Sequence, residues 1–303
     1  MTEPRHFLSL GQLSTEELSD LLDAADAVKA KPRSLSAKLK NKQVALIFEK
    51  PSTRTRVSFE AAVNALGGDA IVLRGDELQL GRGETLQDTG RVLSRYVDAL
   101  VIRTFAQDRL ERLAEGASIP VINALSDFSH PCQGLADLQT IREKKDTLEG
   151  VALGYLGDGN NVAHSLMFGG ALAGMNVRIA SPSSHSPSAE VARRAELTAA
   201  RSGGSVVVTE VVAEAASGAD VLYTDVWTSM GQEGSRAEGL EHYRLDRTAV
   251  ELAADDVIVM HCLPAHRGEE IEAEVMDGPH SVVWEQAENR LHTQKALLAW
   301  LLG

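Results

Sequence analysis

The sequence predicts an α/β protein with two lobes, each built on a parallel β-sheet. Short apolar, β-branched runs alternate with stretches of helical periodicity, which is typical of parallel α/β folds. A polar helical segment separates four of these runs from six others. Unusual polar residues follow nearly every run, and open parallel sheets bind ligands beyond the carboxyl ends of their strands. These observations predict two lobes with the active site in the cleft between them.

The first lobe is predicted to span residues 1–133. Its expected strands are Val44–Phe48, Ala70–Leu73, Ala99–Arg103 and Ile119–Ile122. After the first strand, apolar residues recur at helical spacing until Gly67 ends the helix. That apolar face consists of Phe59, Ala62, Val63 and Leu66.

Residues 134–149 are predicted to form a linking helix, and residues 150–285 the second lobe. The expected strands of this lobe are Val151–Leu156, Val177–Ala180, Val206–Val208, Val221–Tyr223, Val257–Met260 and Val282–Trp284. Segment 286–303 is predicted to be a helix that packs back on the first lobe, because Ala296–Leu302 is apolar.

Composition excludes several classes of protein. With 303 residues, of which 44% are hydrophobic, the chain can fill a core in each lobe. It has no run of about 18 apolar residues and no signal-peptide core, so we expect a cytoplasmic protein without a membrane partner. A net charge of −13 argues against nucleic acid as a partner, so any anion site must be a small pocket. The two cysteines, Cys132 and Cys262, are too few for a disulfide framework.

The turn after the first strand carries the strongest sign of function. Pro51 takes the chain out of the strand, and Ser52 or Thr53 is placed to cap the following helix. The first turn of a helix has unpaired N–H groups and attracts anions, and the guanidinium of Arg54 matches two phosphate oxygens. The alternative is an ordinary capped helix with a solvated basic turn. Polar residues at the other strand ends favour the phosphate pocket.

Those other strand ends provide a second cation and several hydrogen-bonding groups. Arg103 ends the third strand, and His130 follows the fourth with Gln133 one helical turn further on. A cation and a donor to a carbonyl oxygen suit an acyl phosphate. In the second lobe, Asp225 and Cys262 follow two of the strands.

Position alone leaves alternatives open for several of these residues. Asp225 suits an ammonium group or the cap of a helix, and Cys262 suits a buried hydrophobe, a nucleophile or a ligand. The loop Gly157-Asp158-Gly159-Asn160-Asn161 suggests a dinucleotide site, but Val162 stands where the third glycine belongs. An asparagine at such a helix start can instead bind a carboxylate. No paired ligand spacing supports zinc near His130, Cys132, His261, Cys262 or His266, so no metal is predicted.

Three motifs together resemble the signatures of the carbamoyltransferases. They are Ser52-Thr53-Arg54-Thr55-Arg56, His130-Pro131-Cys132-Gln133 and His261-Cys262-Leu263-Pro264. The loop from Asp225 to Gly231 is similar to that of the ornithine-specific members, whereas aspartate carbamoyltransferases differ there. The resemblance spans nearly the whole chain and places it in the aspartate/ornithine carbamoyltransferase family, on the ornithine carbamoyltransferase branch. The chain departs from the family pattern at one point: some relatives carry a lysine in the loop after Gln79, where this chain has Arg82-Gly83.

The resemblance implies transfer of the carbamoyl group of carbamoyl phosphate to the side-chain amine of L-ornithine, giving L-citrulline and phosphate. It implies that lobe 1–133 binds carbamoyl phosphate and lobe 150–285 binds ornithine. It implies three catalytic residues: Arg103, His130 and Cys262. The implied contacts with carbamoyl phosphate are Ser52, Thr53, Arg54, Thr55, Arg103, His130, Pro131, Cys132, Gln133, Cys262, Leu263, Arg290 and, from a neighbouring subunit, Gln79. The implied contacts with ornithine are Asn161, Asp225, Ser229 and Met230.

The same resemblance implies no cofactor and a homo-oligomer, a trimer or a multiple of it, that acts in arginine metabolism. The sequence leaves open the direction of the reaction and whether Cys262 or the departing phosphate takes the proton of the amine. Rival hypotheses are a nucleotide-dependent dehydrogenase, a non-catalytic amino-acid-binding module, and a carbamoyltransferase acting on putrescine or an acylated ornithine.

Overall fold

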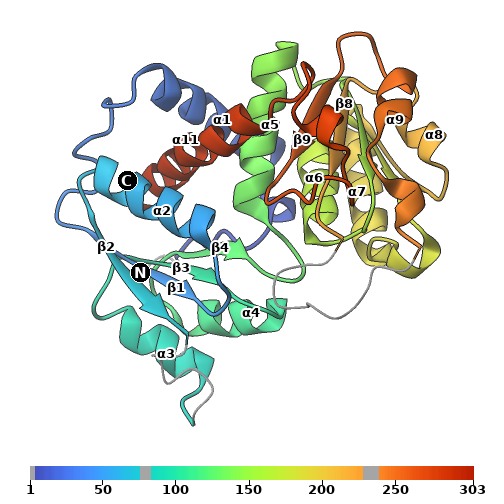
Figure 1. Cartoon of the computed structure of the whole chain (residues 1–303). Helices are drawn as coiled ribbons and strands as arrows, with labels where there is room; N and C mark the ends of the chain where they lie inside the picture. The colour runs from blue at the N-terminus through green and yellow to red at the C-terminus, as the bar shows by residue number, and fades with distance from the viewer. Residues whose placement is uncertain (1–3, 76–82, 228–238) are drawn as a thin grey trace. The chain divides into compact units, whose positions relative to one another are not determined.

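A computed structural model describes residues 4–75, 83–227 and 239–303 (Figure 1). It divides into two compact units, each with its own parallel sheet, as predicted. Unit 1 comprises Met1–Leu13, Ser19–Leu135 and Arg290–Gly303, and unit 2 comprises Ser14–Leu18 and Ala136–Asn289. Gln79, Ser229 and Met230, which were predicted as site residues, lie outside the described residues, as does Arg82.

Unit 1 is built on a four-stranded parallel sheet of order β2-β1-β3-β4. The strands are β1 (Gln43–Phe48), β2 (Asp69–Arg74), β3 (Ala99–Arg103) and β4 (Val121–Leu125). From β1 the chain first adds β2 on one side and then β3 and β4 on the other. The order therefore reverses between β1 and β3, which is where open parallel sheets bind their ligands.

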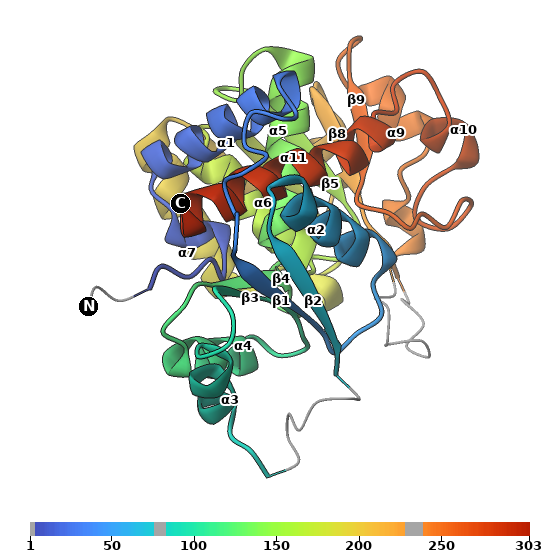
Figure 2. The same ribbon diagram turned by 90° about the vertical axis from the view of Figure 1, so that its left-hand side faces the viewer.

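Helices cover both faces of this sheet. Figure 2 shows α3 (Leu86–Leu93) and α4 (Gln107–Gly116) on one side and α2 (Thr53–Ala65) on the other. The α4 face buries Ala45 and Ile47 of β1 against Leu110 and Leu113. The apolar face predicted for α2 is fully buried, as illustrated by Phe59 at 0% exposure.

The glycine predicted to end α2 is required there. Gly67 has a φ of +81°, and a Cβ on it would lie 2.6 Å from the backbone oxygen of Ser36. A side chain at this position would be both strained and blocked.

Three further helices contribute to unit 1. α1 (Thr15–Ala30), α5 (Pro131–Lys145) and α11 (Val283–Leu302) all contain a boundary of the two-unit division. The part of α11 from Arg290 onward belongs to unit 1, and the part of α5 up to Leu135 does as well. A short 3-10 helix, η1 (Leu10–Gln12), precedes α1.

Unit 2 is built on a five-stranded parallel sheet of order β7-β6-β5-β8-β9. The strands are β5 (Ala152–Leu156), β6 (Asn176–Ala180), β7 (Ser205–Thr209), β8 (Val221–Thr224) and β9 (Ile258–His261). The helices are α6 (Asn161–Leu172), α7 (Ala189–Ser202), α8 (Val212–Ala216), α9 (Arg247–Leu252) and α10 (Ala273–Met276), with the 3-10 helices η2 (Ser183–His185) and η3 (Glu241–Tyr243). Here the strand order reverses between β5 and β8.

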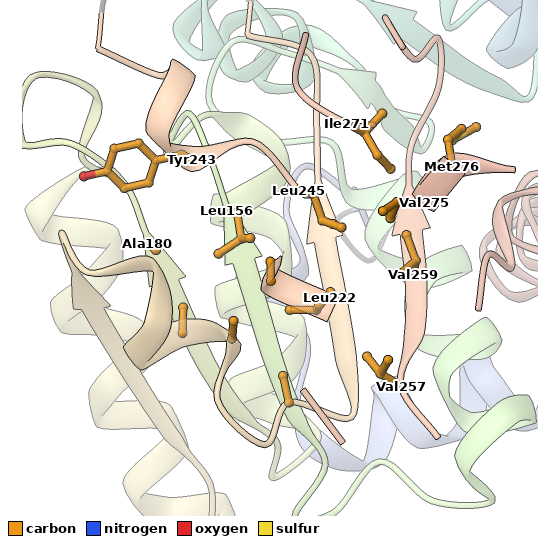
Figure 3. Close-up of a cluster of buried hydrophobic side chains, with 14 of the residues drawn as sticks. Leu156, Ala180, Leu222, Tyr243, Leu245, Val257, Val259, Ile271, Val275 and Met276 are labelled. Carbon is orange, nitrogen blue, oxygen red and sulfur yellow. The ribbon is translucent and has the colours of Figure 1, made fainter. Parts of the chain in front are cut away.

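One face of this sheet carries a continuous apolar core. Leu156 of β5, Leu222 of β8 and Val259 of β9 pack with residues from α10 and the loops that flank it, including Met276 and Ile271 (Figure 3). This core fixes the carboxyl ends of β8 and β9, which precede Asp225 and Cys262.

The predicted strand Val282–Trp284 is wrong. Val283 and Trp284 begin α11, and only Ser281, just before them, forms an isolated bridge with Val259. A three-residue apolar run fits a helix start as well as a strand, and here the long helical continuation decides. Arg290 therefore projects from the interior of a helix and does not follow a strand.

Among the described residues, none of the helices combines the length and the apolar character that a membrane span requires.

Candidate active site

The amino end of α2 presents its first turn without a side-chain cap. Ser52 is the N-cap residue, with an extended backbone (φ −163°), but its side chain makes no capping hydrogen bond. The first helical N–H groups therefore lack the usual hydroxyl acceptor, and they are available to an anion.

Arg54, in this same turn, has no partner among the described residues. Its side chain is half-buried, and no carboxylate of the described chain pairs with it. Arg56, two residues on, is exposed and lies 3.9 Å from Glu60. Arg54 is thus the guanidinium of this turn that remains available to a ligand, whereas Arg56 has an ordinary surface role.

Arg290 joins the α2 turn to the segment that starts α5. Its Nη2 donates to Thr55 Oγ1 at 2.6 Å, and its Nη1 donates to Gln133 Oε1 at 3.0 Å. All three side chains are buried. Buried charges are retained only with partners, so this arrangement fixes a guanidinium inside unit 1.

Arg103 and His130 complete this group, which we call the phosphate cluster: Ser52, Thr53, Arg54, Thr55, Arg103, His130, Gln133 and Arg290. A register shift between β3 and β4 falls at Arg103, and such irregularities redirect a side chain at the end of a strand. Burial lowers the pKa of His130 well below 6.5, and the charges of Arg290 and Arg103 lower it further. His130 is therefore a neutral imidazole at physiological pH, which can donate one N–H without adding charge.

Local contacts hold the residues next to His130. Pro131 starts α5, and Gln133 and Gly134 donate their N–H groups to the carbonyl of His130. Cys132 is buried, its Sγ lies 3.4 Å from the carbonyl oxygen of Asn123, and burial raises its pKa to about 12. A thiol in that state is not a nucleophile.

The carboxyl ends of β5, β8 and β9 carry a second group of side chains, all in unit 2. Asn160 caps α6 by accepting from the N–H groups of Val162 and Ala163, and its Nδ2 donates to Asp225 Oδ2 at 2.9 Å. Cys262 Sγ lies 2.7 Å from Asp225 Oδ1. Asp225 is 4% exposed, so both oxygens of a buried carboxylate are held by side chains. We call Asn160, Asn161, Asp225, Cys262 and Leu263 the ornithine cluster, after the substrate that the sequence resemblance implies.

A buried network holds the backbone next to Cys262. The N–H of His261 donates to Gln286 Oε1 at 3.0 Å, and Gln286 Nε2 donates to Asp137 Oδ1 at 2.7 Å. The N–H of Leu263 donates to His261 Nδ1 at 2.9 Å, so the proton of the neutral ring lies on Nε2, which is 3.1 Å from Glu270 Oε1.

This network bears on metal binding. Asp225, His261 and Cys262 have potential ligand atoms within 4.8 Å of one another. Both nitrogens of His261 are already engaged, so the ring has no lone pair to offer a metal without breaking a buried hydrogen bond. The donor set favours a site without a metal.

Asp158 is a second carboxylate near Asp225. Burial, together with the charge of Asp225, raises the pKa of Asp158 to about 7. The carbonyl of Asp158 accepts from the hydroxyl of Tyr155 at 2.7 Å, which fixes the loop that carries it.

We expect Asp158 to make stability fall as pH rises. Between about pH 4 and pH 7 the folded protein holds a proton on Asp158 that the unfolded chain has released, so folding weakens across this window. Asp158→Asn should therefore stabilise the protein at pH 8 relative to pH 5, by about 2–4 kcal/mol. Thermal unfolding of both proteins at the two pH values measures this, and an equal difference in Tm at both would contradict it.

The structure adds positioning residues that the sequence did not reveal. Asn160 was read only as part of a glycine-containing loop, although an asparagine two residues before an apolar helix is a capping signal. No sequence pattern indicated a role for Gln286. It lies 25 residues after its partner His261 and in a helix, whereas His261 ends a strand.

Known proteins match the chain over its length. Residues 5–143 match a family model described as the carbamoyl-P binding domain of aspartate/ornithine carbamoyltransferase, and residues 149–301 match the Asp/Orn binding domain of the same family. A protein from Parafrankia sp. named ornithine carbamoyltransferase is 60% identical, with 98% of this chain and 96% of the relative covered.

Solved structures agree with these matches. Ornithine carbamoyltransferase from Pyrococcus furiosus is 50% identical, with a TM-score of 0.95 over 99% of this chain and 98% of that one. A structure titled acetylornithine transcarbamylase complexed with acetylcitrulline is 31% identical, with a TM-score of 0.87 over 99% of each chain.

Proposed function

Because the chain belongs to the aspartate/ornithine carbamoyltransferase family, we propose that it transfers the carbamoyl group of carbamoyl phosphate to the side-chain amine of L-ornithine, which yields L-citrulline and phosphate. The observation that carries this proposal is the phosphate cluster. It combines a helix amino end without a side-chain cap, the guanidinium of Arg54, which has no partner within residues 4–75, 83–227 and 239–303, and a neutral, buried His130.

The phosphate cluster suits an acyl phosphate better than a simple phosphate ester. The turn Ser52–Thr55 and Arg54 provide N–H, hydroxyl and guanidinium donors for phosphate oxygens. Thr55, Arg103 and His130 are donors for the carbamoyl oxygen, whose negative charge grows as the amine adds. A donor placed for that developing charge contributes about 3 kcal/mol in comparable sites. We assign Gln133 and Arg290, which are hydrogen-bonded to each other, to the carbamoyl group as well.

The ornithine cluster suits the second substrate. The carboxylate of Asp225 fits the α-ammonium group of ornithine, and Asn161 at the start of α6 fits its carboxylate. We include Ser229, Met230 and Gln79 in the proposed contacts on the resemblance alone. Cys262 and Leu263 are assigned to the reacting amine.

The reaction needs a deprotonated amine. A free alkylamine has a pKa of about 10 and is protonated at neutral pH, so it must lose a proton before it attacks the carbamoyl carbon. The amine then adds, the C–O bond to phosphate breaks, and phosphate leaves. Either the departing phosphate takes the proton, or the Cys262 thiol passes its own proton to the Asp225 carboxylate and its sulfur then takes the proton of the amine.

Cys262→Ser distinguishes these two acceptors. The hydroxyl is similar in size and can still donate to Asp225, so we expect an unchanged Tm. If the deprotonated sulfur of Cys262 accepts the proton, kcat falls by about tenfold. This is less than the loss of a general base usually costs, because phosphate can accept the proton in its place. An unchanged kcat between pH 7 and 9 would instead assign the proton to phosphate.

A citrulline assay with carbamoyl phosphate and a panel of amines tests the proposal. L-Ornithine should be the preferred acceptor, with little product from putrescine, Nα-acetylornithine or aspartate. The charge on Asp225 supports this order, because acetylation removes the α-ammonium group and putrescine has no carboxylate for Asn161. Preference for an acylated amine would overturn the substrate assignment, and NAD-dependent turnover would overturn the class of enzyme.

We further propose that the protein is a cytoplasmic homotrimer, or a multiple of it, that acts in arginine metabolism. The support is the family resemblance, in which Gln79 reaches the phosphate from a neighbouring subunit. Analytical ultracentrifugation gives the assembly.

A further inference from the structure

Two charged residues in the turn from β1 to α2 have buried side chains and no part in the proposed chemistry. They are Glu49, whose side chain is 10% exposed, and Lys50, whose side chain is 6% exposed. Lysine is almost never buried without a partner. Both residues immediately precede the turn Ser52–Thr55, which holds the phosphate in the proposed function.

Lys50 is attached to the segment that leads to His130. Its Nζ lies 2.5 Å from Asp127 Oδ1, and it also sits 4.4 Å from the centre of the Phe105 ring. Asp127 comes three residues before His130, and its N–H donates to the carbonyl of Phe105 at 2.7 Å. The ammonium group is therefore paired with a carboxylate and covered by an aromatic ring, so Lys50 is not a direct ligand for phosphate.

Glu49 is attached to the segment that follows Arg103. Its carboxylate accepts from the hydroxyl of Thr104 and from Arg109 Nη2, the latter at 2.5 Å. Its N–H donates to the carbonyl of Arg103 at 2.9 Å. Glu49 thus fixes the start of the turn against the end of β3.

These contacts connect three loops that carry the donors of the phosphate cluster. Loops that follow separate strands are not linked directly along the chain, so side-chain contacts such as these help to fix their relative positions. A displacement of about 1 Å in a catalytic group can cost about 100-fold in rate.

We propose that Lys50 and Glu49 are positioning residues, which clamp the phosphate turn to the segments of His130 and Arg103. The proposal rests on the proposed function for its effect on turnover, but not for its effect on phosphate binding. Lys50→Met removes the charge and keeps the length, and Asp127→Asn removes the partner. Lys50→Arg keeps a cation that can still pair with Asp127.

The chain offers a control at the opposite end of the strands of the same sheet. Lys42 Nζ lies 3.2 Å from Asp98 Oδ1, and these residues come directly before β1 and β3. Lys42→Met breaks an ion pair between the segments that precede β1 and β3, at the opposite end of these strands from the phosphate turn. It should leave the activity and the affinity for phosphate unchanged.

The experiment is a double-mutant cycle between Lys50 and Asp127. For each variant we would measure kcat/KM for carbamoyl phosphate, the KM for ornithine and, by calorimetry, the Kd for inorganic phosphate. We expect each single variant to lose about tenfold in kcat/KM and in phosphate affinity, with the KM for ornithine nearly unchanged. The double variant should be no worse than Lys50→Met, and Lys50→Arg should recover most of the loss.

Other outcomes overturn the proposal. Additive losses, or an unaltered Asp127→Asn, would mean that Lys50 acts on phosphate directly. A fall in Tm matching that of Lys42→Met, without any change in phosphate affinity, would reduce the pair to an ordinary stabilising contact. If the wild-type protein binds phosphate but makes no citrulline, the proposed function is refuted. The calorimetric Kd values for phosphate would still show whether Lys50 and Asp127 position the phosphate turn.

Discussion

Arg54→Ala should reduce kcat/KM for carbamoyl phosphate by about 100- to 1,000-fold, the largest effect that we expect from a single substitution. Arg54 lies in the uncapped first turn of α2 and has no partner among the described residues. Its guanidinium is therefore available to the phosphate, which gains charge as it leaves. Most of the loss should appear in kcat, because the interaction is strongest in the transition state.

Arg56→Ala is the matched control for this prediction. Arg56 lies on the same helix turn but is exposed and pairs with Glu60. Exposed pairs of this kind contribute at most about 1 kcal/mol, so the control should retain its kinetics and nearly all its stability. Steady-state citrulline formation measures both variants. Equal kinetics for the two would refute the phosphate pocket at the start of α2.

Asp225→Ala should raise the KM for ornithine by about 10- to 100-fold and leave the affinity for carbamoyl phosphate nearly unchanged. The estimate follows from hydrogen bonds to charged groups, which are worth about 1.5–3 kcal/mol each. The substitution also removes the acceptor that holds the side chains of Asn160 and Cys262. We therefore expect some loss of kcat as well.

The control for Asp225 is Asp246→Ala in the same unit. Asp246 caps α9 by accepting from the N–H of Ala249 at 2.9 Å, so its loss should cost about 1 kcal/mol of stability without affecting ornithine. Calorimetric titration of each substrate distinguishes the two variants. If both variants bind ornithine equally well, Asp225 is a structural residue.

The sequence was sufficient for the fold class and the family, and both predictions are confirmed by the parallel sheets and by the matches over the whole chain. The reason is that parallel strands end at a common edge of the sheet. A polar residue that follows an apolar run is therefore expected at that edge, where ligands bind. Arg103 and Asp225 were located in this way. The roles assigned to individual residues stay predictions.

The pairing of side chains could not be predicted from the sequence. Arg290 and Thr55 are 235 residues apart, and their contact depends on how a helix packs, which no local pattern specifies. The apolar run Val282–Trp284 failed for a related reason, since three residues do not distinguish a strand from the first turn of a helix. In the sequence, Glu49 and Lys50 are an ordinary charged pair before Pro51. Only the structure shows that their side chains are largely buried and which residues they contact.

The separation between Arg290 and its two acceptors also bears on biosynthesis. The ribosome adds Arg290 157 residues after Gln133 and 235 residues after Thr55. All four strands of unit 1 have emerged long before then, yet the guanidinium that joins the two acceptors is still missing. A nascent chain can thus form the sheet early, but the buried contacts that join Thr55 to Gln133 through Arg290 form only after α11 has been made.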